Sequence, residues 1–251
     1  MEMDAQVLPF GADSPGSGVV RITGRYRLPS DVASELKHVL AENPLVVILD
    51  MDEVAGNSRS LPDVFEPVAS YLAAWPGTLV VVCAPHPAKA ARLLPPTIID
   101  RVIVSRTWED GLDRAREIIP HQHRTTTFLQ PHPEACEDGR TFARRTLHDW
   151  RLEDLTWPAS LVVSELVTHS IVHADTALDL TLSRIDERIR IAVHDYGSDN
   201  LRITQLATPD DPLEDPLLHR GLLLVRALTR SWGVFPSRDH GKTVWAVMEA
   251  A

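Results

Sequence analysis

The chain has 251 residues, 44% hydrophobic and 24% charged, a composition typical of a globular protein. The formal net charge is −10, and residues 1–119 (11 basic, 16 acidic) and 120–251 (14 basic, 19 acidic) are both acidic, which argues against a nucleic-acid partner. No apolar run reaches the about 18 residues of a membrane span and no signal pattern opens the chain, so we expect a cytoplasmic protein without a membrane partner.

The first half alternates apolar runs with helical patterns. Residues 1–17 contain Gly, Ser, Pro and Asp without periodicity, which predicts a disordered start. Runs of consecutive apolar residues are typical of strands buried on both faces. We therefore predict an α/β domain over residues 18–119, with a mostly parallel sheet and helices against it. The predicted strands are 19–22, 45–49, 78–83 and 101–104, and the predicted helices are 29–41, 61–74, 87–94 and 108–119.

Residues 120–133 are predicted to be a linker. Residues 121–133 are polar and contain two prolines and three consecutive threonines. Phe128 and Leu129 fit equally well as the start of an edge strand of the next domain. Cys83 and Cys136 lie on either side of this segment, and we expect them to be unpaired in a reducing compartment.

The second half, residues 134–251, has a different pattern. Two helices are followed by an alternating hairpin at 178–182 and 189–193, a loop of about 20 residues rich in Asp and Pro, another helix and two closing strands. Strands with one apolar face need a helical layer on that face. The order predicts a two-layer α+β sandwich.

The second of these helices carries three polar residues on an apolar background. Glu165, His169 and His173 are spaced by four and share one stripe. A solvated face, or a core histidine with a satisfied hydrogen bond, would explain this stripe without any function. A helical zinc site is disfavoured, because the glutamate precedes both histidines and no third ligand is evident.

Four motifs in the predicted order carry a resemblance to a known family. They are Ser164-Glu-Leu-Val-Thr-His-Ser-Ile-Val-His-Ala174, Val193-His-Asp-Tyr-Gly197, Arg220-Gly-Leu-Leu-Leu-Val225 and Asp239-His-Gly-Lys-Thr-Val-Trp245. Residues 128–250 thereby resemble the ATP-binding domain of the GHKL (Bergerat) class, and in particular the anti-sigma-factor serine kinases of partner-switching systems.

The resemblance implies a site for ATP or ADP with Mg²⁺. In such a site Glu165 is the base that orients a substrate serine hydroxyl. Asp195 accepts a hydrogen bond from the adenine amino group, and Gly197 lets the backbone approach the base.

Two further segments complete the implied nucleotide site. Arg220 and Gly221 form the turn after the lid, where free N–H groups of a helix face phosphate oxygens. Lys242 and Thr243 lie on the last strand, where the threonine can bond the adenine-binding carboxylate or a bridging water.

The chain departs from the family at several positions. His169 replaces the Asn that ligates Mg²⁺, and imidazole is a poor substitute for an oxygen ligand of this ion. His219 replaces a glycine, and the lid contains four acidic residues, Asp210, Asp211, Glu214 and Asp215. These departures favour an alternative, a degenerate binding module with weak or no Mg²⁺-dependent nucleotide binding.

The first half resembles a STAS domain, the fold of the anti-sigma-factor antagonists. Aligning Leu49-Asp-Met-Asp-Glu-Val54 with that family places Arg59 at the phosphoserine position and leaves Ser58 and Ser60 as phosphoacceptor candidates. Both serines equally fit as N-caps ahead of Pro62.

Together the resemblances predict a two-domain regulator of the partner-switching type. A STAS-like domain would precede an ATP-binding domain that is either a protein-serine/threonine kinase or a non-catalytic module. Its partner would be a sigma factor, a STAS-type antagonist or both, and the family often forms homodimers.

Overall fold

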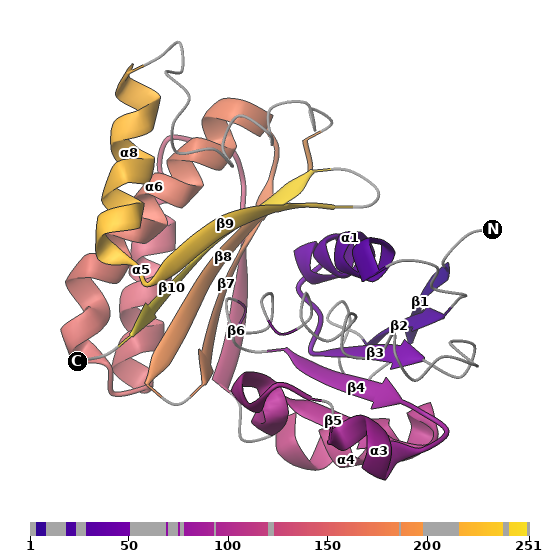
Figure 1. The fold of residues 1–251 in the computed structure, drawn as a ribbon. Coiled ribbons are helices and arrows are strands. Elements are labelled where there is room, and N and C mark those ends of the chain that lie inside the picture. The colour runs from indigo at the N-terminus through magenta and orange to yellow at the C-terminus, as the bar shows by residue number, and fades with distance from the viewer. Residues whose placement is uncertain are drawn as a thin grey trace. The chain divides into compact units, whose positions relative to one another are not determined.

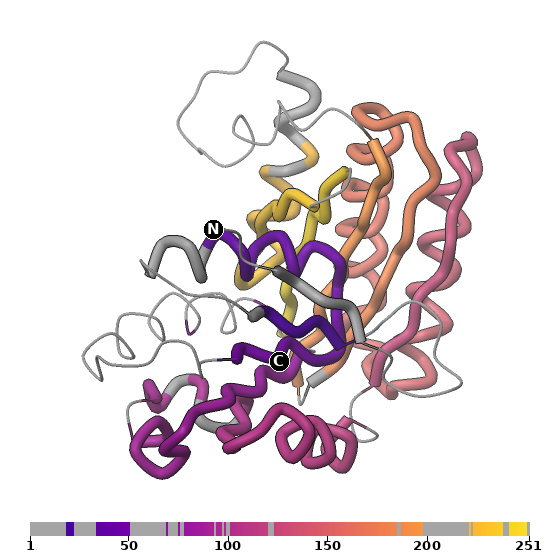
Figure 2. Tube along the Cα trace, turned by 90° about the vertical axis from the view of Figure 1, so that its right-hand side faces the viewer, coloured from indigo at the N-terminus to yellow at the C-terminus, as the bar shows by residue number. Residues whose placement is uncertain are grey.

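We describe the protein from a computed structural model. It divides into two compact units, Met1–Gln122 and His123–Ala251. In Figure 2 the colour runs from indigo to magenta through the first unit and from pink to yellow through the second. The described residues are 4–8, 19–23, 29–50, 69, 75, 78–92, 94–119, 123–185, 187–197, 216–237 and 241–249.

The first unit contains a five-stranded sheet in the order β1-β2-β3-β4-β5 (Figure 1). Strand β1 is antiparallel to β2, and the other neighbours are parallel. The elements are β1 Asp4–Leu8, β2 Val19–Thr23, α1 Pro29–Ala41, β3 Val46–Asp50, β4 Leu79–Cys83, α3 Pro87–Ala91, the 3-10 helix η1 Pro96–Arg101, β5 Val102–Ser105 and α4 Trp108–Ile118.

The core of this unit follows from its central strands. Nearly all of β3 and β4 is buried, as expected for parallel strands covered on both faces. Helix α4 begins at its N-cap Thr107, whose hydroxyl accepts from the backbone N–H of Asp110. Gly111 lets α4 approach the sheet, because a Cβ there would lie 2.2 Å from Cγ1 of Val81. The predicted α/β layering is confirmed at this coarse level.

Of two predictions for the first unit, one is wrong in part and the other lies almost entirely outside the described residues. The disordered start over residues 1–17 is wrong for Asp4–Leu8, which forms β1 and pairs with β2 from Asp4↔Thr23 to Leu8↔Val19. Backbone pairing along an edge supplies the order there that side-chain periodicity did not indicate. The helix predicted over 61–74 lies outside the described residues except for Ala69, a buried helical residue.

The second unit is an antiparallel sheet in the order β6-β7-β8-β10-β9, with α5, α6 and α8 on one side of it (Figure 1). The described helices contact one another and the sheet mainly through α6. The elements are β6 His123–Leu129, α5 Ala135–Asp149, the 3-10 helix η3 Glu153–Leu155, α6 Thr156–Ala174, β7 Leu178–Ile185, β8 Arg188–Asp195, α8 Pro216–Leu228, β9 Ser231–Pro236 and β10 Lys242–Glu249.

Alternation along the strands produces this core. The apolar residues at alternating positions of β7, β8 and β10 join one buried cluster with the apolar face of α6. Members of that cluster include Leu166, Leu180, Ile191, Val193 and Val244. The predicted hairpin is confirmed, since β7 and β8 pair from Leu178↔Asp195 to Ile185↔Arg188.

The linker predicted over 120–133 is largely a strand. Residues His123–Leu129 form β6, which pairs with β7, so the alternative role of Phe128 and Leu129 in an edge strand is the correct one. The physical reason lies in the threonines, whose β-branched side chains favour strands. The hydroxyls of Thr126 and Thr181 lie 2.9 Å apart across the two strands.

Two further findings bear on the class of protein. Within the described residues, no helix combines the length and the apolar character needed to cross a bilayer. Cys83 lies in β4 and Cys136 in α5, and no disulfide joins them.

Candidate functional site

Helix α6 carries the polar stripe that the sequence indicates. Its apolar face is buried, with Val162, Val163, Leu166 and Val167 fully covered. The helix ends at Asp175, which adopts a left-handed conformation with φ 48° and closes the helix through its N–H to the carbonyl of Ile171. The stripe therefore lies on an ordered helix that packs against the sheet and contacts α5 and α8.

Glu165 lies directly against α8. A Cβ built on Gly221 would be 2.1 Å from Oε2 of Glu165, so the carboxylate occupies the space beside this glycine. Helix α8 begins at Pro216, which makes Gly221 its sixth residue. Only the first four N–H groups of a helix lack an internal partner, so the predicted role of Gly221 as a phosphate-facing helix start is not met. The side chains of His219 and Arg220 lie outside the described part of the chain.

His169 is buried beneath the same site. The residue is 6% exposed, and its Nε2 has no hydrogen-bond partner among the residues that the structure describes. The His173 ring lies 4.4 Å away between centroids, at an interplanar angle of 51°. Burial lowers the pKa of His169 from 6.5 to about 3, with smaller contributions from the positive charges of His173 and Lys242. The imidazole is therefore neutral at neutral pH.

Asp195, the implied adenine-binding residue, is held in an ion pair. Its Oδ2 lies 2.8 Å from Nζ of Lys242, and the two side chains are 1% and 8% exposed. The pair follows from the sheet register, which places Lys242 of β10 directly opposite Asp195 of β8. Lys242 alternates with Val244, Ala246 and Met248, so it points to the helix side of the sheet.

Two glycines shape the chain around Asp195. The N–H of Gly197 donates to Oδ1 of Asp195 at 3.3 Å, and a Cβ on Gly197 would be 2.8 Å from Cβ of Ala174 at the end of α6. Gly241 has φ +86°, and a Cβ there would lie 1.8 Å from the carbonyl oxygen of Asp195. Asp195 is thus enclosed by backbone on two sides.

Thr243 points away from this group. Its register partner is His194, and its hydroxyl lies 3.0 Å from Nδ1 of that ring. Successive residues of a strand face opposite sides of the sheet, so Lys242 and not Thr243 reaches the helix side beside Asp195.

The structure thus brings several predicted site residues together at the junction of α6, β8, β10 and α8. They are Glu165, His169, Asp195, Gly197, Gly221 and Lys242. Other predicted positions, namely Ser58, Ser60 and the acidic lid residues, lie outside the described residues.

The sequence motifs alone do not indicate that Lys242 is the ion-pair partner of Asp195. A signal for this pair is present, because a lysine at an apolar-facing strand position needs a buried counter-charge. The opposing residue is Asp195, and pairing the two strands in register reveals it.

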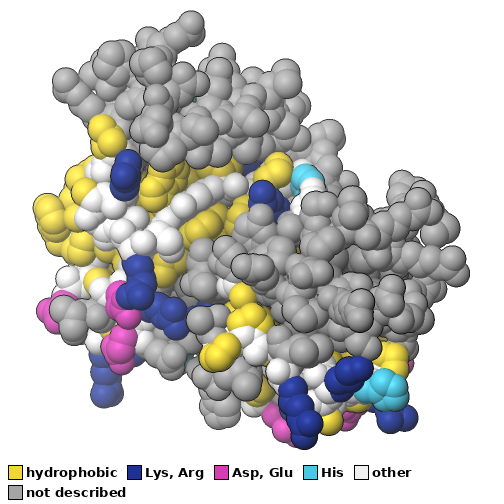
Figure 3. All heavy atoms as spheres, viewed as in Figure 1, with side chains coloured by type: hydrophobic (Ala, Val, Ile, Leu, Met, Phe, Trp, Pro, Cys, Tyr) yellow, Lys and Arg dark blue, Asp and Glu magenta, His cyan; other side chains and the backbone are white. Residues whose placement is uncertain are grey.

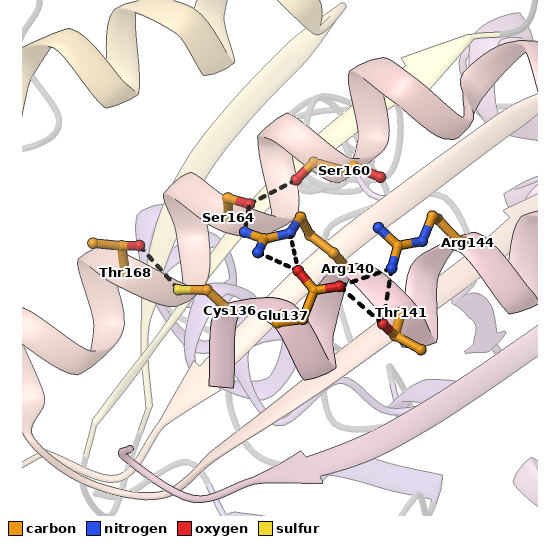
Figure 4. Close-up of polar contacts among 8 residues, drawn as sticks. All are labelled: Cys136, Glu137, Arg140, Thr141, Arg144, Ser160, Ser164 and Thr168. Atoms are coloured by element: carbon orange, nitrogen blue, oxygen red, sulfur yellow. Dashed lines mark hydrogen bonds and ion pairs between the residues drawn. The ribbon is translucent and has the colours of Figure 1, made fainter. Parts of the chain in front are cut away.

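A second polar network joins α5 to α6 beside Glu165 (Figure 4). Glu137 accepts from Arg140 and Arg144, and Nη1 of Arg140 donates to Oγ of Ser164 at 2.9 Å. Hydrogen bonds from Arg144 and then Arg140 lower the pKa of Glu137 to about 2. Because Ser164 precedes Glu165, this network fixes the α6 segment that carries the predicted base.

The donor atoms of the side chains at this site decide which metal ion it could hold. Among the described residues, no group of three or more His, Cys, Asp or Glu side chains is arranged to hold a metal ion. Mg²⁺ requires oxygen ligands, whereas His169 offers a nitrogen. The positive charge of nearby Lys242 also contributes to the lowered pKa of this imidazole. These residues do not fit Mg²⁺.

Comparison with known proteins adds no family assignment. No protein-family model matches the sequence, and no curated protein matches it.

Proposed function

We propose that this chain is a regulator of the partner-switching type that acts by binding a protein partner and not by transferring phosphate. Its second unit would be a degenerate module of the GHKL class, derived from the anti-sigma-factor kinases. The partner would be a sigma factor or a STAS-type antagonist, as the resemblance of both halves implies. The buried ion pair between Asp195 and Lys242 carries the proposal.

The ion pair opposes adenine binding. A nucleotide would need the Asp195 carboxylate to accept from the adenine amino group, yet an ammonium group already occupies Oδ2 at 2.8 Å. Displacing Lys242 would leave a buried charge without a partner, which costs several kcal/mol, about 3–5 in measured cases. An adenine amino group is a neutral donor, and its attraction to the carboxylate is weaker than that of the charged ammonium group.

Two further contacts weigh against catalysis. The neutral imidazole of His169 stands where the family has its Mg²⁺ ligand, and no phosphoryl transfer of this kind proceeds without charge neutralisation of the phosphates. The Glu165 carboxylate lies against Gly221 of α8, so this helix covers the predicted base on that side.

The arrangement of the fold supports a binding role. The first unit has the mostly parallel α/β sheet expected of a STAS-like domain, and the second has the two-layer form expected of the kinase-like domain. A partner-switching regulator needs a stable surface for its partner protein. A module whose nucleotide site is closed would remain folded without ATP and could keep that surface.

A phosphoryl-transfer assay tests this proposal. The full chain is incubated with γ-labelled ATP, Mg²⁺ and STAS-type antagonists of the source organism, and binding of the same antagonists and of sigma factors is measured by calorimetry without nucleotide. We expect a partner to bind and no label to be transferred.

A matched variant sharpens the test. His169→Asn with Lys242→Thr restores an oxygen ligand and frees Asp195, and it should gain Mg²⁺-dependent nucleotide affinity of about tenfold or more. Label transfer by the unaltered chain would contradict the non-catalytic assignment, and the absence of binding to every antagonist and sigma factor would contradict the partner class.

A further inference from the structure

A basic pocket lies in the first unit. It has a volume of about 640 Å³, and its polar lining consists of His86, Lys89, Arg92 and Arg106. Figure 3 shows dark blue Lys and Arg side chains and a cyan His side chain gathered at the lower right, in the region of α3 and α4. We call these four residues the basic pocket.

The topology of the sheet creates this pocket. Strands β4 and β5 are parallel neighbours, so their carboxyl ends lie at the same edge. The N–H of Ala84 donates to the carbonyl of Ser105 at 3.0 Å and ties the two strand ends together. His86 to Arg92 follow β4 and Arg106 follows β5, which brings them to the edge where open α/β sheets bind ligands.

The charge of the pocket is opposite in sign to the net charge of the chain. The chain carries −10 overall, yet no Asp or Glu of the described residues lines the pocket. In the described part of the chain, no ion pair involves the guanidinium groups of Arg92 or Arg106. Glu109 and Asp110 follow Arg106 but belong to the first turn of α4, where acidic side chains favour the helix dipole.

The donor set selects a class of ligand. Two guanidinium groups offer planar pairs of N–H donors that match phosphate oxygens in bidentate geometry. Lys89 adds a point charge, and the His86 ring adds a donor or acceptor. We propose that the basic pocket binds a phosphate monoester dianion. This site is independent of the nucleotide-type site of the second unit and of the function proposed for it.

A phosphate monoester can come from two sources, a phosphorylated serine side chain of a partner protein or the terminal phosphate of a nucleotide. Calorimetry with the full chain uses three probes: a phosphoserine peptide, ADP and inorganic phosphate. The same peptide with unmodified serine, and with glutamate, separates phosphate recognition from binding of the peptide backbone or of a single negative charge.

The double variant Arg92→Gln/Arg106→Gln should weaken binding of the phosphate probe at least about tenfold. Arg116→Gln is the matched control, because Arg116 lies on α4, is ion-paired with Asp113 at 2.9 Å and does not line the pocket. Its removal should change affinity less than about twofold, within the range of long-range charge effects. Thermal unfolding of each variant checks that the exposed substitutions leave the fold unchanged.

The outcomes separate the two sources. Phosphoserine-peptide binding that the double variant loses assigns the pocket to a phosphoprotein, and ADP binding that it loses assigns it to a nucleotide phosphate. ADP binding that persists in the double variant occurs elsewhere. The proposal is overturned if no phosphate probe binds, or if the double variant binds every probe as tightly as Arg116→Gln.

Discussion

Each unit ends an inner strand with an aspartate that pairs with a cation from the neighbouring strand. Asp50 at the end of β3 pairs with Arg21, and Asp195 at the end of β8 pairs with Lys242. The first pair keeps contact with water, with side chains 12% and 23% exposed, whereas the second is 1% and 8% exposed. The guanidinium of Arg21 also lies 5.2 Å from the ring centroid of Trp108.

This difference in burial has a functional meaning. A partly hydrated pair opens at little cost, because water replaces the lost partner. A buried pair is held in place, because each charge depends on the other. Asp195 is therefore expected to stay paired with Lys242, whereas Asp50 can exchange its partner.

Breaking the buried pair should have the largest effect. Asp195→Ala leaves Lys242 buried without a counter-charge and should lower the free energy of unfolding of the second unit by about 3–5 kcal/mol. Hydrogen exchange resolved by peptide measures this unit separately from the first.

The double variant Asp195→Asn/Lys242→Met is the control. It removes both charges and keeps an acceptor for the Gly197 N–H, so it should be more stable than either single variant. A cost of less than about 1 kcal/mol for Asp195→Ala would show that the pair is as replaceable as a surface one.

Acid should destabilise the second unit through His169. Its folded pKa of about 3 lies below the unfolded value of 6.5, so the unfolded chain binds more protons between these two pH values. The stabilisation is complete above about pH 6.5 and is lost as the pH falls toward 3, by at most about 1.4 kcal/mol per pH unit.

Urea unfolding at pH 7 and pH 5 checks this dependence. His169→Asn should flatten the pH slope, whereas His148→Asn, at an exposed position, should leave it unchanged. An equal slope in His169→Asn and the unaltered chain would mean that another group causes the acid sensitivity.

Substituting one glycine in each unit compares how rigidly the two units are packed. In Gly111→Ala the new Cβ meets the β-branched Val81 at 2.2 Å, so we expect a loss of about 1–3 kcal/mol. In Gly221→Ala it meets the end of the Glu165 side chain, which can rotate, and the helix gains up to about 1 kcal/mol from alanine. Chemical denaturation should find the second substitution close to neutral.

The partly hydrated pair should matter least. Asp50→Asn removes one charge from the pair with Arg21 and should cost about 1 kcal/mol or less, with a smaller cost at high salt. Hydrogen exchange of β3 in low and high salt measures it. A loss as large as that of Asp195→Ala would remove the contrast between the units.

Periodicity was sufficient for the elements with a one-sided or fully buried pattern. The apolar stripe of α6 and the alternation of β7 and β8 predict both elements and the face that each buries. The edge strand β1 was missed and β6 was only an alternative to the linker, because both are ordered by backbone pairing and their side chains do not show a clear pattern.

The sequence predicts that several of these residues lie close together, but not the contacts that they make. The motifs predict that Glu165, His169 and Asp195 lie close together. In the structure, the packing of α6 against β8 brings them together. The contact partner of each side chain depends on the strand register and on the residue at which α8 begins. Motif spacing predicts neither. The Lys242 ion pair and the internal position of Gly221 in α8 are therefore results of the structure.

Calorimetric titration of the full chain with ATP and ADP, with and without Mg²⁺, tests the central claim most directly. Because Asp195 is paired with Lys242 and His169 offers no oxygen ligand, we predict no binding at the second-unit site tighter than about 1 mM and no gain on adding Mg²⁺. Micromolar binding that requires Mg²⁺ and disappears in Asp195→Ala would contradict the account.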